Sequence, residues 1–133
     1  MSLRIAPAYG VACAIVGLLL AAPPARAHHS TAAYDLIHGT LIHGVVTGFL
    51  LINPHSQIRM DIAGEDDVTE HWAIELDSAG LLRRLGWSKQ TLKPGDHITV
   101  MGGRAKNGSF HLRAVWVELP DGRRLPALPQ PEK

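Results

Sequence analysis

The chain has 133 residues, of which thirteen are basic, twelve are acidic and 46% are hydrophobic. This length accommodates one domain and excludes a multidomain machine. Much of the apolar content lies before residue 28, so the composition of the whole chain does not describe the part that folds.

The first 27 residues have the three parts of a secretory signal peptide. Arg4 gives a positive start, residues 11–22 form a short apolar run, and Ala25-Arg26-Ala27 matches a small-x-small cleavage site. A membrane-spanning helix needs roughly 20 apolar residues, and Pro23-Pro24 interrupts the run. We therefore expect Sec-type export to the periplasm with cleavage at residue 27, and an uncleaved membrane anchor is the less favoured alternative.

Cleavage at that point changes the chemistry that the protein has available. It removes Arg4, Arg26 and the only cysteine, Cys13, and it leaves eleven basic against twelve acidic residues. A charge balance near neutrality argues against nucleic acid or an anionic membrane surface as a partner, because both require an excess of Lys and Arg. Thiol chemistry and lipid attachment at a cysteine are excluded, whereas all eight histidines remain.

The mature chain begins with a polar segment, residues 28–35, followed by an apolar-rich stretch over residues 36–52. β-Branched residues crowd this stretch and glycine recurs in it, which favours a long, bent strand over a helix. Asn53-Pro54 ends the strand. We expect Gly44 and Gly48 to relieve crowding where the strand bends.

Two shorter strands follow and are joined by a turn. Apolar and polar residues alternate over residues 57–62 and again over residues 71–76, so each strand has one buried and one solvated face. The polar cluster over residues 64–67 is the turn that makes the pair a hairpin. The residues expected in the core, here and in the next strand, are Ile58, Met60, Ile62, Trp72, Ile74, Leu76, Ile98 and Val100.

A short helix separates the first three strands from the last two. Ser78 can cap it, and leucines at helical spacing follow. Strands are expected over residues 97–101 and 110–119. The side chains of the second strand that are expected to point inward change phase near Ala114, which predicts a bulge there: first Phe110, Leu112 and Ala114, then Val115, Val117 and Leu119. Residues 124–133 contain three prolines and few apolar groups, and we expect them to form a tail that does not pack.

Three strands, a helix and two strands are the element order of a five-stranded OB-type barrel. We therefore predict an all-β fold with one short helix, in which the signal peptide (residues 1–27) and a polar lead (28–35) precede an OB-like barrel (36–123) and a proline-rich tail (124–133). Closure removes the sheet edges, which suits a small domain without disulfides. The alternative, an immunoglobulin-like sandwich, needs two more strands than the pattern contains.

Short motifs are spread along the whole mature chain: His28-His29-Ser30, Tyr34-Asp35, Asn53-Pro54-His55, Trp72 with Glu75, Gly86-Trp87, Leu92-Lys93-Pro94-Gly95-Asp96 and Leu119-Pro120-Asp121-Gly122-Arg123. In their order and spacing they resemble the small exported bacterial proteins of the DUF6152 family. The resemblance implies export and a compact β domain. It implies no activity, because the family has none assigned.

The new N-terminus is the strongest candidate for a binding site. Signal cleavage frees an α-amine on His28 beside its own imidazole, with the imidazole of His29 next in the chain. Nitrogen donors of this kind suit Cu(II) best among the divalent metals. His55, on the turn after the first strand, is the best distant histidine to complete a site, and Tyr34 and Asp35 are further candidates. The favoured alternative is a soluble, frayed lead whose residues suit signal-peptidase processing.

Other polar residues carry less weight. Glu75 and Asp77 share one strand face, but exposed carboxylates on a strand usually serve to solvate it. If the register of the hairpin is known to within one residue, His71 can lie opposite Asp61. The two side chains are then expected to form an ordinary cross-strand pair. Trp87, after the helix, is expected to plug one end of the barrel.

Catalytic motifs are missing from the sequence, which has no nucleophile elbow, no phosphate loop that opens a helix and no HExxH metal motif. We therefore expect a protein that is not an enzyme and has no cofactor: a monomeric periplasmic binding or accessory module for a protein or small-molecule partner, with no stable membrane insertion after cleavage. The alternative is a copper-binding protein that uses His28, His29 and His55, in which case copper is its cofactor.

Overall fold

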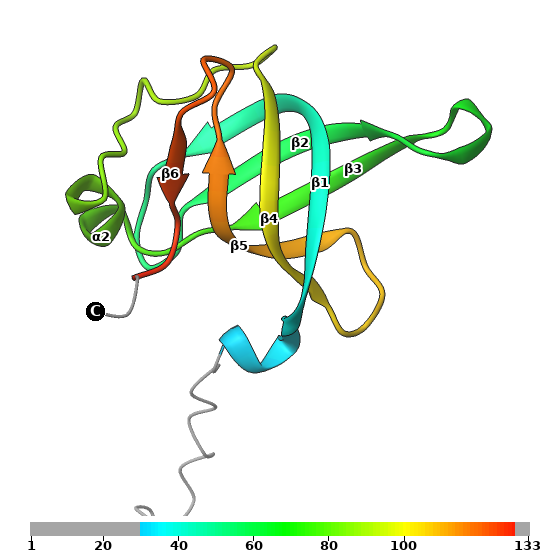
Figure 1. Cartoon of the computed structure of the whole chain (residues 1–133), viewed down its shortest axis with the longest axis horizontal. Coiled ribbons are helices and arrows are strands. Elements are labelled where there is room, and N and C mark those ends of the chain that lie inside the picture. The colour runs from blue at the N-terminus through cyan, green and yellow to red at the C-terminus, as the bar shows by residue number, and fades with distance from the viewer. Residues whose placement is uncertain (1–29, 130–133) are drawn as a thin grey trace, which may run out of the picture.

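The computed structural model describes residues 30–129, and the predicted signal peptide over residues 1–27 lies outside them. In chain order the elements are η1 (Ser30–Ala33), β1 (Tyr34–Leu50), β2 (Gln57–Ala63), η2 (Glu65–Asp67), β3 (Thr69–Glu75), α2 (Ala79–Arg84), β4 (His97–Ala105), β5 (His111–Glu118) and β6 (Arg124–Pro126) (Figure 1). The strands form one sheet in the order β3-β2-β1-β4-β5-β6, and β3 also pairs with β5. That pairing closes β1 to β5 into a barrel, which confirms the predicted all-β, OB-like fold with one short helix.

The long strand β1 takes part in both halves of the barrel, because its first part pairs with β4 and its last part with β2. Its register with β2 shifts between Val46 and Gly48, and the strand curves strongly (Figure 1). A Cβ atom at Gly44 would lie 2.5 Å from the carbonyl oxygen of Asp61, whereas one at Gly48 would lie 4.0 Å from its nearest neighbour. Crowding therefore requires glycine at position 44, as predicted, but not at position 48.

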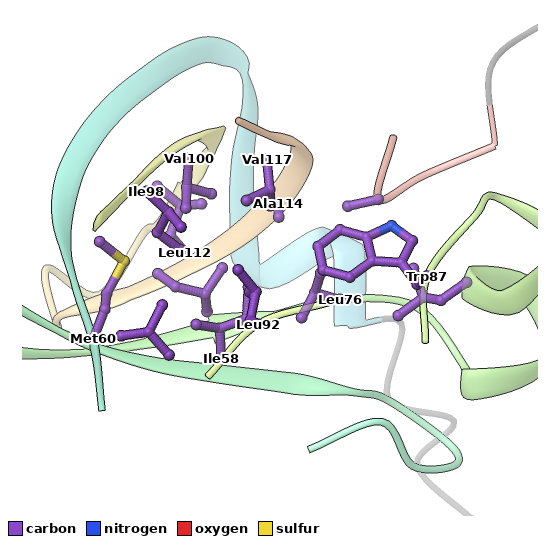
Figure 2. Packing of buried hydrophobic residues seen from close by; sticks show 14 of the residues in the cluster. Ile58, Met60, Leu76, Trp87, Leu92, Ile98, Val100, Leu112, Ala114 and Val117 are labelled. Carbon is purple, nitrogen blue, oxygen red and sulfur yellow. The ribbon is translucent and has the colours of Figure 1, made fainter. Parts of the chain in front are cut away.

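Inward side chains of the barrel strands form a single core. Figure 2 shows side chains from β2, β4 and β5 converging in it: Ile58, Met60, Ile98, Val100, Leu112 and Val117. Seven of the eight residues predicted to be buried are buried, and Ile62 is half-buried against the cluster. Phe110 was expected to point inward, but it is 40% exposed because it precedes β5 and does not share the alternation of that strand. Its ring lies against that of Trp72, with centroids 5.4 Å apart.

One side of the core is covered by α2 and the segment after it (Figure 1). Ser78 caps this helix as predicted, and its Oγ accepts a hydrogen bond from the amide of Leu81 at 3.3 Å. Trp87 is buried, and its indole N–H donates to the carbonyl oxygen of Pro126 at 2.8 Å. In the described part of the chain no helix is long and apolar enough to cross a membrane.

The end of the fold differs from its sequence prediction. Residues 124–133 were expected not to pack, yet β6 pairs with β5 and Ala127 has no exposed surface. The pattern missed β6 because this strand is three residues long and ends in proline. The bulge predicted near Ala114 is confirmed, since the register between β4 and β5 shifts by one residue at Val115.

Candidate functional site

Polar side chains from distant parts of the chain meet around the end of β3. They come from the start of β1, the loop between β1 and β2, the end of β3 and the middle of β5: Tyr34, His55, Glu75, Asp77 and Arg113. We refer to these five residues as the Glu75 cluster. The register explains part of this meeting, because Glu75 is the direct partner of Arg113 in the parallel pairing of β3 with β5.

Glu75 is the centre of the cluster. Its Oε1 accepts a hydrogen bond from Nη1 of Arg113 at 2.9 Å, and its Oε2 accepts one from the Tyr34 hydroxyl at 3.0 Å. Nδ1 of His55 lies 2.9 Å from the same Oε1. This contact is an ion pair when the imidazole of His55 is protonated.

Arg113 anchors the cluster from beneath, since only 4% of its side chain is exposed. In addition to Glu75, it donates to the carbonyl oxygen of Leu76 at 2.7 Å through Nη1 and to Oδ2 of Asp77 at 3.2 Å through Nη2. A buried charge needs such partners, because an unpaired one is costly to remove from water. Within residues 30–129, Nε of Arg113 finds no hydrogen-bond partner.

Tyr34 connects the start of the fold to the cluster. Burial and the adjacent negative charge of Glu75 raise the pKa of Tyr34 to about 12, so at neutral pH the phenol stays protonated and acts as a donor. It is the first residue of β1 and follows η1 directly. The start of β1 and the loop between β1 and β2 therefore contact the same carboxylate, through Tyr34 and His55.

The outer face of the sheet continues from the cluster into a hollow. Arg59, Ala73 and His111 are register partners across β2, β3 and β5, and Ala73 and Glu75 share one face of β3 because alternate residues do so. The methyl side chain of Ala73 leaves a hollow of about 450 Å³ on this face. Its lining includes polar groups from four strands, β1, β2, β3 and β5: Thr47, Gln57, Arg59, Asp61, His71 and His111.

Of the three predicted metal ligands, His55 alone belongs to the described residues. His28 and His29 lie outside the described residues, whereas His55 belongs to the Glu75 cluster. Among residues 30–129 no group of three or more His, Cys, Asp or Glu side chains is arranged to hold a metal ion. Four other histidines have partners for Nδ1: His38 with Asp35 (2.9 Å), His43 with Thr99 (2.8 Å), His71 with Asp61 (2.7 Å) and His111 with Ser109 (3.1 Å). The predicted pair of His71 and Asp61 is thus confirmed.

Sequence reasoning missed the centre of the cluster. It interpreted Glu75 and Asp77 as exposed, solvating carboxylates, but only 22% and 27% of their side chains are exposed and both are ion-paired with Arg113. The available signal was a single arginine between Leu112 and Ala114, in a strand that is otherwise apolar at that point. Arg113 lies beside Glu75 because barrel closure pairs β3 with β5 in parallel. No local sequence pattern predicts this pairing.

Comparison with known proteins identifies the family of the chain. The model of a family of unknown function, DUF6152, matches residues 15–113. The chain belongs to this family. No curated protein and no solved structure matches it. The DUF6152 match spans the whole Glu75 cluster, and three of the motifs that carry the family resemblance meet there through Tyr34, His55 and Glu75.

Proposed function

We propose that this DUF6152 protein is a non-enzymatic binding module of the periplasm, and that its ligand or partner docks on the outer face of β2, β3 and β5. The observation that carries this proposal is the hollow over Ala73, next to the ion pair of the buried Arg113 and the partly buried Glu75. The ion pair of Arg113 and Glu75 joins β5 to β3 beside this hollow. In OB folds the face of strands 2 and 3 and the adjoining loops bind ligands, and this analogy of fold supports the same location.

The chemistry of the Glu75 cluster supports binding over catalysis. Both carboxylate oxygens of Glu75 already accept hydrogen bonds from neighbours, so this group is a poor general base. Tyr34 has its pKa raised to about 12 by burial and by Glu75, far from the neutral range in which an acid or base works best. A nearly neutral mature chain supports a partner other than nucleic acid or an anionic membrane.

Export is part of this proposal. Sec-type secretion and cleavage at residue 27 deliver a monomer that begins at His28 to the periplasm. The intact mass of protein recovered from the periplasm tests this step. A mass that lacks residues 1–27 is expected, and full-length protein in washed membranes would contradict it.

A small-molecule fragment screen tests the binding face. In ¹H–¹⁵N correlation spectra, hits are expected to shift the amide signals of Arg59, Ala73 and His111. Ala73→Leu should abolish these shifts because the larger side chain fills the hollow. Ala63→Leu is the matched control, since it adds the same atoms at an exposed position at the end of β2. Hits that gather elsewhere, or that survive Ala73→Leu, would disprove the assignment of this face.

Copper binding through the processed N-terminus is a second candidate function. The observation that favours it is the contact of both Tyr34 and His55 with Glu75. Through this contact the start of β1 lies near His55, the distant histidine that was predicted as a ligand. Cu(II) titration of the mature protein tests it against a variant with one alanine added before His28. The addition separates the α-amine from the histidine ring and should weaken binding sharply, whereas equal affinities would exclude the N-terminal site.

A further inference from the structure

We propose that the outer face of the barrel binds a small monocarboxylic acid: Arg59 receives its carboxylate, and its apolar tail lies in a second hollow over Gly48. This inference rests on the non-enzymatic binding function proposed above, and it adds the chemical class of the ligand and the group that recognises it. Two observations carry it, the position of Arg59 between two hollows and the unpaired charge of its guanidinium.

Arg59 lies between the two smallest residues of this face. Its register partner on β1 is Gly48, and its register partner on β3 is Ala73. Partners that lie directly opposite each other point to the same face of a sheet. A Cβ atom at Gly48 would meet only the Cβ of Arg59, at 4.0 Å. The missing side chain at position 48 therefore leaves open space beside Arg59.

The hollow over Gly48 differs in chemistry from the hollow over Ala73. It has a volume of about 400 Å³, and both hollows share Thr47, Gln57 and Arg59 in their lining. A volume of this size is typical of small-molecule sites, which take up roughly 300–1,000 Å³. The rest of its lining is free of charged side chains and mainly apolar: Gly48, Phe49, Leu50, Leu92 and Pro94. Arg59 thus lies at the boundary between an apolar and a polar hollow.

The guanidinium of Arg59 is available for a ligand. None of the ion pairs within residues 30–129 includes it. Its Nε donates to Oε1 of Gln57 at 3.4 Å, and neither Nη group takes part in a hydrogen bond with that part of the chain. The side chain is exposed. A guanidinium with both Nη groups available can donate two parallel hydrogen bonds to one carboxylate.

The acidic residues nearby favour a ligand with a single negative charge. Asp61 lies two residues along β2 from Arg59 and lines the hollow over Ala73. Glu75 is the register partner of Gln57, in the next row of side chains on this face. Like charges repel, and these two carboxylates oppose a dianion such as a phosphate monoester more strongly than a monoanion. A carboxylate therefore fits this face better than a phosphate does.

Four probes separate the contribution of the head group from that of the tail, in ¹H–¹⁵N titrations of the mature protein. Hexanoate has both parts, hexanamide lacks the charge, acetate lacks the tail, and hexyl phosphate carries a larger charge. Hexanoate is expected to shift the amide signals of Gly48, Leu50 and Arg59. It should bind at least about 10-fold more tightly than acetate, because its methylene groups leave water, and about 10-fold more tightly than hexanamide. Equal affinity for hexanoate and hexanamide, or tighter binding of hexyl phosphate, would overturn the proposal.

Substitution of Arg59 tests the receptor of the carboxylate. Arg59→Gln should weaken hexanoate binding by about 10-fold, the effect of losing a charge-assisted hydrogen bond, and should change hexanamide binding by less than about 2-fold. Arg83→Gln makes the same replacement at an exposed position on α2 and should leave both affinities unchanged. A purely structural role of Arg59 would weaken both probes equally, and that result would overturn the proposal.

Substitution of Gly48 tests the place of the tail. Gly48→Leu should remove the advantage of hexanoate over acetate, because the new side chain occupies the apolar hollow. Gly80→Leu is the matched control, since a Cβ atom there meets nothing within 4 Å. If Gly48→Leu fails to fold, Leu50→Ala gives the same test at a position that is 49% exposed. An unchanged preference for hexanoate in Gly48→Leu would overturn the assignment of this hollow.

Failure of this inference can be told apart from failure of the proposed function. Fragments that bind over Ala73, together with hexanoate that leaves the spectrum unchanged, would overturn the inference and leave the binding face standing. Hexanoate that binds at Arg59 without any fragment hits over Ala73 would support the inference and disprove the role of the Ala73 hollow.

Discussion

Among single residues, Arg113 matters most for the Glu75 cluster. It is buried and pairs with two carboxylates at once, Glu75 and Asp77. Arg113→Ala should lower the free energy of unfolding by about 3 kcal/mol or more, because it leaves partly buried carboxylates without their cation. Arg123→Ala is the control, since Arg123 forms an exposed pair with Asp121 and its loss should leave the free energy of unfolding nearly unchanged. Urea unfolding measures both variants, and equal losses would contradict the anchoring role of Arg113.

Tyr34 can be observed by itself, because the only other tyrosine, Tyr9, precedes the predicted cleavage site. Burial and Glu75 raise its pKa from 10.0 to about 12, so the ultraviolet absorbance of tyrosinate should rise near pH 12. The raised pKa means that folding favours the protonated phenol. Its contribution to stability is therefore complete below pH 10 and is lost as the pH rises through 12. Tyr34→Phe should lack this part of the pH dependence, and a midpoint near pH 10 in the folded protein would disprove the contact.

At the scale of elements, the sequence pattern of a strand predicts the features that depend only on that strand and its hairpin neighbour. Alternation places Ile58 and Met60 in the core, and cross-strand pairing joins His71 to Asp61, because both depend only on a strand and its hairpin partner. Phe110 and β6 were assigned wrongly. Phe110 precedes the strand whose alternation it was thought to share, and β6 is too short to show a period.

Gly44 is the element-scale constraint that a substitution can test. A Cβ there would lie 2.5 Å from the backbone oxygen of Asp61, so Gly44→Ala must push β1 and β2 apart. Overpacking of this kind costs about 1–3 kcal/mol. Gly48→Ala is the matched control four residues along the same strand, where the nearest atom is 4.0 Å away. Thermal unfolding should show a lower midpoint for the first variant alone, and equal midpoints would mean that β1 adapts freely.

At the scale of the whole molecule, barrel closure creates the candidate site. His55 was predicted as a ligand from its place on a turn, but its partner could not be, because Glu75 and Arg113 meet only when β3 pairs with β5. Tyr34 joins them from the start of β1. Three motifs that lie far apart in the chain thus meet in one cluster because of the long-range pairing of the strands. The sequence pattern of a single strand does not predict this pairing.

The C-terminal segment tests how far the folded unit extends. Deletion of residues 124–133 removes β6, the buried Ala127 and the carbonyl of Pro126 that accepts the Trp87 N–H. A buried N–H left without a partner costs about 1–3 kcal/mol, and the exposed apolar surface adds to this loss. Deletion of residues 130–133 alone is the control and should leave the unfolding midpoint unchanged. Circular dichroism and Trp fluorescence should report a clearly lower midpoint for the longer deletion. Equal midpoints would show that β6 lies on the barrel without stabilising it.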